Sequence, residues 1–108
     1  MIYLSQLLNQ KVWDGFGHVV GKLDDIMVNS TEKNMPPIAA LVLKNAVDGK
    51  KMIDAQSIAS LWPSIALKTD INKALPYTPK GHELFLKKRV LDQQIVDLEG
   101  RRLVRVND

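Results

Sequence analysis

The sequence of 108 residues contains no cysteine. This absence excludes disulfide scaffolds, thiolate metal sites and cysteine nucleophiles, and it agrees with a reducing compartment. No segment approaches the roughly 20 apolar residues that a membrane span requires. The opening Met1-Ile2-Tyr3 has neither the basic start nor the apolar stretch of a signal peptide. We therefore expect a cytoplasmic chain that does not insert into a membrane.

The composition is that of a single folded domain. Apolar residues make up 45% of the chain and charged residues 25%, which is ordinary for a globular protein and far from the profile of disordered chains. The net charge is +3, and the whole excess of positive charge lies after residue 67. A solvated charged face explains such an excess, and so does an acidic partner or a nucleic acid.

The two ends of the chain resemble each other. Residues 1–25 align without gaps onto residues 84–108, at a constant offset of 83. Conservative pairs such as Val12 with Ile95 accompany the identities. The identical pairs are Leu8 with Leu91, Gln10 with Gln93, Asp14 with Asp97, Gly17 with Gly100, and Asp25 with Asp108.

Each copy of this repeat predicts a short lead-in turn, a strand, a tight turn and a second strand. The turns are residues 14–17 and 97–100, which begin with Asp and end with Gly. An Asp at the first turn position accepts a local backbone N–H, and a Gly at the fourth supplies a positive φ. In the first copy, Ser5 is expected to cap a single helical turn. We therefore predict two β-hairpins.

Between the hairpins, residues 38–43, 51–53 and 65–67 have the apolar, β-branched pattern of short strands. The prolines and glycine of residues 76–81 predict a connector. The expected fold is all-β, a barrel or sandwich with short helical turns. The expected division is residues 1–75, a connector over 76–83, and the second hairpin unit over 84–108, packed on the same core or beginning a second barrel.

The first hairpin resembles the opening of the PRC-barrel family. The Asp14 to Gly17 turn, the pair Gly21-Lys22 and Asp25 carry this resemblance, which is clearest over residues 1–70. It implies a small β-barrel that acts as a docking surface, as in the photosynthetic reaction-centre H subunit and the ribosome-maturation factor RimM. Residues 90–108 resemble a segment that joins PRC-barrel regions to MgtE-type magnesium transporters and CBS domains.

The motifs for catalysis and for cofactors are weak. Gly15-Phe16-Gly17 falls short of a dinucleotide fingerprint because a strand, and no helix, follows it. The adjacent Asp24 and Asp25 could bind a divalent cation. The alternative is a structural role at the end of the hairpin strand. His18 and His82 are isolated. We expect no enzyme activity, cofactor or metal, and we expect both tryptophans, at positions 13 and 62, in the core.

The first functional hypothesis is a non-catalytic protein-interaction or regulatory module, the N-terminal part of a longer cytoplasmic protein related to magnesium transport. Phe16, at a hairpin tip, is its candidate contact for another protein or domain. The alternative is an RNA- or ribosome-associated module of the RimM type. A homodimer through the unpaired last strand is a further expectation. The alternative would use a basic patch of Lys87, Lys88, Arg89, Arg101, Arg102 and Arg105.

Overall fold

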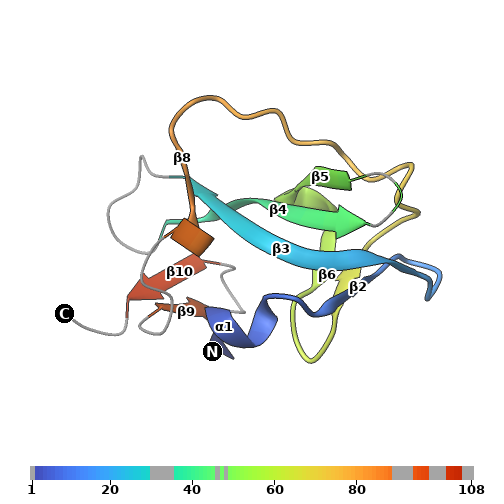
Figure 1. Ribbon diagram of the computed structural model, residues 1–108, viewed down its shortest axis with the longest axis horizontal. Helices are drawn as coiled ribbons and strands as arrows, with labels where there is room; N and C mark the ends of the chain where they lie inside the picture. The colour runs from blue at the N-terminus through green and yellow to red at the C-terminus, as the bar shows by residue number, and fades with distance from the viewer. Residues whose placement is uncertain are drawn as a thin grey trace.

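The computed structural model describes residues 2–29, 36–45, 47, 49–88, 94–97 and 102–105. Its strands form two sheets (Figure 1). In chain order the elements are β1 (Ile2–Tyr3), α1 (Leu4–Leu7), β2 (Lys11–Trp13), β3 (Val19–Asn29), β4 (Ile38–Asn45), β5 (Gly49–Asp54), η1 (Ala55–Ser57), β6 (Ile58–Ser60), β7 (Ile65–Leu67), β8 (Glu83–Phe85), η2 (Leu86–Lys88), β9 (Gln94–Asp97) and β10 (Arg102–Arg105).

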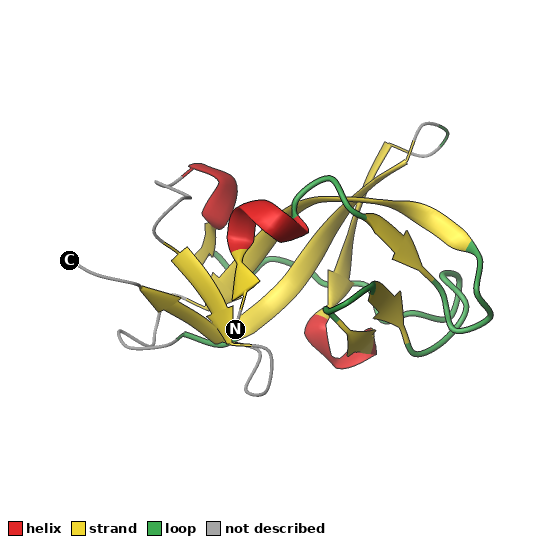
Figure 2. Ribbon diagram, turned by 90° about the horizontal axis from the view of Figure 1, so that it is seen from below, coloured by secondary structure: helices red, strands yellow, loops and turns green. Residues whose placement is uncertain are grey.

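The larger sheet has seven strands and is organised around β3. Its order is β5-β4-β3-β2-β7-β6, and β8 pairs with the far end of β3. The smaller sheet has the order β1-β9-β10. Figures 1 and 2 show this smaller sheet beside α1 at one end of the molecule, with the β2–β3 turn at the other end. The mostly-β fold predicted from the sequence is thus confirmed.

The two predicted hairpins are present. β2 pairs antiparallel with β3, and β9 pairs antiparallel with β10. In the first turn, Asp14 Oδ1 accepts the backbone N–H groups of Phe16 and His18, both at 2.8 Å, and Gly17 has a φ of +85°. A helical turn precedes each hairpin, α1 in the first copy and η2 in the second. The repeat therefore extends to the order of the elements.

The seven-stranded sheet does not close into the barrel that we expected. Within the described residues its path ends at β5 and β6, which do not pair with each other. The reason is that the outer edge of β5 is already occupied. Asp54 donates its backbone N–H to Leu75 O at 2.8 Å, and Tyr77 donates its own to Met52 O at 2.9 Å. The connector after β7 thus takes the edge that closure would need.

Two other local expectations were wrong. The helical turn begins at Leu4, before Ser5, and Gln6 Oε1 accepts the N–H of Tyr3 at 3.1 Å. Trp62 is 49% exposed, because the neighbouring Leu61 enters the core from the same loop. Trp13 is only partly buried. The tryptophans therefore contribute less to the core than we predicted.

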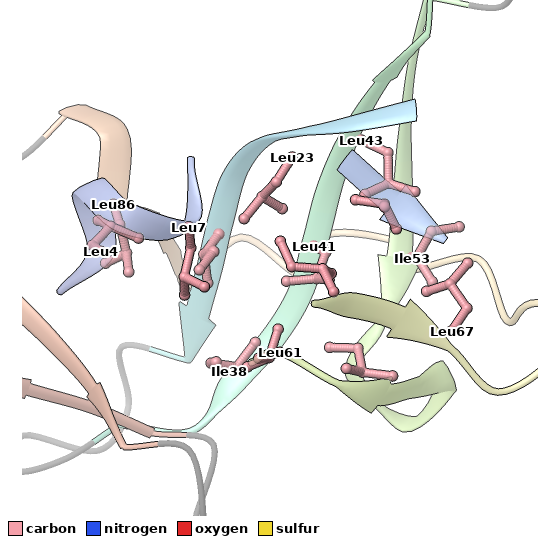
Figure 3. Close-up of a cluster of buried hydrophobic side chains, with 14 of the residues drawn as sticks. Leu4, Leu7, Leu23, Ile38, Leu41, Leu43, Ile53, Leu61, Leu67 and Leu86 are labelled. Atoms are coloured by element: carbon pink, nitrogen blue, oxygen red, sulfur yellow. The ribbon is translucent and has the colours of Figure 1, made fainter. Parts of the chain in front are cut away.

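The main core is built from the larger sheet, from β1, from the helical turns α1 and η2, and from the connector after β7. Its fully buried members come from many elements, as Figure 3 shows. Leu4 from α1 and Leu86 from η2 lie beside each other, and Leu23 and Leu41 come from the central strands. A smaller cluster around Met27 covers the opposite face of β3 and β4. Within the described residues, no helix combines the length and the apolar character needed to cross a bilayer.

Leu86 allows a test of how the second repeat unit is attached. Its side chain is 1% exposed, so truncation leaves a cavity between η2 and α1. We expect Leu86→Ala to lower the free energy of unfolding by about 2–5 kcal/mol. Leu75→Ala, at a side chain that is 50% exposed, is the control and should cost about 0.5 kcal/mol or less. Urea unfolding measures both, and equal small losses would show that η2 does not pack on the main core.

Candidate functional site

The strand register gathers four lysines into one line across the larger sheet. Lys11 on β2 is directly opposite Lys22 on β3, Lys22 is opposite Lys44 on β4, and Lys44 is opposite Lys50 on β5. Neighbouring strands lie about 4.8 Å apart, so this lysine row extends over about 14 Å. The lysine row thus places four cationic side chains on four neighbouring strands.

The lysine row lies on the face of the sheet away from the main core. Val12, Leu23 and Leu43, each a sequence neighbour of one of these lysines, are buried in the main core. Because successive side chains in a strand point to opposite faces, the lysines point outward. Burial of the apolar neighbours therefore determines where the charges go.

One end of the lysine row is balanced by Asp24. This carboxylate contacts Lys50 Nζ at 3.0 Å, Lys87 Nζ at 3.0 Å and Lys44 Nζ at 3.8 Å. Its side chain is 8% exposed. The hydrogen bond from Lys50, followed by that from Lys87, keeps the pKa of Asp24 below its ordinary value, although burial acts in the opposite direction.

A β-bulge in β3 lies at Asp24 and Asp25. Leu23 pairs with Leu43 and Asp25 pairs with Val42, which leaves Asp24 as the extra residue on β3. Asp25 Oδ1 accepts the backbone N–H groups of Ile26 at 2.8 Å and of Lys87 at 2.9 Å. Burial raises the pKa of Asp25. The expectation that this pair ends the hairpin strand was wrong, since β3 continues to Asn29.

Two hollows adjoin the lysine row. The first, of about 530 Å³, is open and is lined in part by Lys11, Lys22 and Lys44. The second, of about 310 Å³, shares Lys11 and Lys22 with the first and also has Trp13 and Trp62 in its wall. We call the second one the tryptophan hollow. Cationic and aromatic side chains therefore meet at this end of the row.

An amide links the lysine row to the tryptophan hollow. Asn9 lines the hollow, and its Oδ1 accepts a hydrogen bond from Lys44 Nζ at 2.6 Å. Asn9 is held in place because its backbone N–H donates to Leu23 O at 2.7 Å. The two features thus form one continuous surface.

The contact residues predicted from the sequence are spread over several elements. Phe16 is 71% exposed at the β2–β3 turn, as expected for a hairpin tip. Lys87 donates a hydrogen bond from Nζ to Asp24 Oδ1, and Lys88 Nζ lies over the Phe85 ring at 5.6 Å from its centroid. The remaining predicted basic residues are Arg102 and Arg105 in β10 of the smaller sheet, and Arg89 and Arg101, which lie outside the described residues.

Sequence reasoning missed the lysine row. Its four members are separated by up to 39 positions in the chain, and they come together only through the pairing of four strands. The available signal was local: a lysine stands directly beside a core residue in each of β2, β3 and β4. That signal indicates an outward face, but it does not indicate which lysines become neighbours.

Comparisons of the chain with protein-family models, with curated proteins and with solved structures found no match. The PRC-barrel resemblance and the functions that it implies therefore stay predictions.

The two adjacent aspartates should respond oppositely to pH. Asp24 has a lowered pKa in the folded state, so its stabilising effect is present above the ordinary pKa and is lost as the pH falls through the folded pKa. Asp25 has a raised pKa, so its contribution is complete below the ordinary pKa and is lost as the pH rises through the folded pKa.

We therefore expect Asp24→Asn to cost about 1 kcal/mol of unfolding free energy at pH 7, and less at about pH 3. Asp25→Asn should be more stable than the parent chain at pH 7, with no gain at about pH 3. Urea unfolding at both pH values measures the four differences. A shift of both variants in the same direction at pH 7 would contradict this account.

Proposed function

We propose that this chain is a non-catalytic binding module that recognises an extended anionic partner through the lysine row. The observation that carries the proposal is the register that sets Lys11, Lys22, Lys44 and Lys50 directly opposite one another. Such a row is complementary to a chain of negative charges. Its outward position leaves it accessible to a partner.

The energetics of the sheet support this proposal. Like charges directly opposite each other on neighbouring strands destabilise a sheet. Asp24 relieves the repulsion at the Lys44–Lys50 end, where it contacts both lysines. At the other end, Lys11 and Lys22 form no ion pair with any residue that the structure describes. A bound anion would offset the repulsion there.

The charge distribution also supports an anionic partner. The chain has a net charge of +3 and a pI near 9.3. A row of like charges on a sheet face produces a local potential larger than the net charge suggests, and this speeds association with an oppositely charged partner. The proposed partner is thus defined by its negative charge.

A second candidate function is docking to another protein or domain through the β2–β3 turn. The exposure of Phe16, at 71%, favours it, because a large apolar side chain at a hairpin tip is available for contact. If the predicted relation to magnesium-transport proteins holds, the partner would be a domain of such a protein. Loss of binding to that domain on Phe16→Ala would support this candidate.

The test of the main proposal is binding to long-chain inorganic polyphosphate, measured by calorimetry across a range of salt concentrations. The double variant Lys11→Gln/Lys22→Gln should bind more weakly. The negative slope of log K against log salt should become shallower by about 1.4, because two contacts are lost. The control is Lys73→Gln/Lys80→Gln, which removes the same charge from two exposed lysines outside the row. The control should keep most of the parent affinity. Equal losses in the two double variants would refute the proposal.

A further inference from the structure

We infer that the anionic partner is a single-stranded nucleic acid, whose phosphates lie along the lysine row while a base stacks in the tryptophan hollow. This inference rests on the proposed function, because it identifies the partner of the same face. It begins from the position of the hollow, which shares Lys11 and Lys22 with the row. A ligand held by those lysines would border the hollow whose wall contains Trp13 and Trp62.

Trp62 is the side chain that points to a base. It is 49% exposed, and Leu61 beside it already fills the core position. Indole rings next to cationic side chains form platforms on which successive bases stack, while the cations track the backbone. The pairing of Trp62 with Lys11 and Lys22 around one hollow matches this arrangement.

The polar groups in the hollow favour a base over a lipid chain. Gln10 and Ser64 lie in its wall together with Asn9. Base edges offer donors and acceptors to amides and hydroxyls, whereas an acyl chain would leave these groups without hydrogen bonds. An anionic membrane would neutralise the lysines but would leave the polar groups of the hollow without partners. The same holds for an acidic peptide without flat rings.

Stacking on Trp62 also selects single strands over duplexes. The bases of a duplex are stacked on each other and expose only their edges in the grooves. A protein aromatic side chain reaches a base face only where the base is unstacked, as in single strands and loops. The proposed partner is therefore a single strand of DNA or RNA.

The experiment uses the full chain with a labelled oligothymidylate of about ten nucleotides, a length within the range of known single-strand sites. The matched probe is an abasic oligomer of the same length, which keeps the phosphates and lacks the bases. Fluorescence anisotropy at fixed salt gives both dissociation constants. We expect the oligothymidylate to bind about tenfold more tightly than the abasic oligomer.

The variants separate stacking from charge. Trp62→Ala should remove most of this tenfold preference and leave abasic binding unchanged, while Trp62→Phe, which keeps a flat ring, should retain most of the preference. Tyr3→Ala removes an exposed aromatic side chain outside the hollow and should leave both constants unchanged. The abasic comparison uses the unaltered protein, so it stands even if a variant folds poorly.

Three outcomes overturn the inference. If the abasic oligomer binds as tightly as the oligothymidylate, or if Trp62→Ala keeps the preference, no base stacks in the hollow. If polyglutamate or phosphatidylserine vesicles bind more tightly than the oligothymidylate, and only with Lys11 and Lys22 intact, the partner is one of these and the proposed function survives. If no anion shows dependence on Lys11 and Lys22, the proposed function fails as well.

Discussion

The antiparallel pairing of β3 with β4 is the interaction on which the rest of the structure depends. In this register Leu23 meets Leu43 on the core side and Lys22 meets Lys44 on the outer side. A slip of one residue would exchange the two faces, exposing the leucines and burying the lysine charges. The burial of apolar side chains therefore also aligns the lysines, so the stability of the core and the geometry of the lysine row have one cause.

The β-bulge in β3 joins this pairing to the second half of the repeat. Asp25 accepts the backbone N–H of Lys87, Asp24 binds its ammonium group, and Leu86, one residue earlier, enters the core beside Leu4. The helical turn η2 is thus attached by polar contacts to the outer side of β3 and by apolar packing to its inner side. The attachment carries a desolvation cost, which is visible in the raised pKa of the Asp25 carboxyl.

Local features were predictable from the sequence, and features that depend on distant pairing were not. The first hairpin follows from Asp14 and Gly17, whose side chain and positive φ act within the same turn. The second hairpin followed from its likeness to the first. The open sheet was not predictable, because the connector's pairing with β5 competes with closure. The lysine row was missed for the same reason, since it exists only once four strands are in register.

The charge pattern shows why composition alone directed attention to the C-terminal part of the chain. Residues 1–67 contain six lysines and six acidic residues, so their net charge is zero. In the folded chain several of the acidic residues have local structural tasks: Asp14 closes a turn, Asp54 caps η1, and Asp24 and Asp25 hold the bulge to η2. Within the described residues, none of these carboxylates forms an ion pair with Lys11 or Lys22. Folding explains the position of each of these aspartates, whereas the repulsion between adjacent lysines opposes folding, and the proposed anionic partner would offset that repulsion.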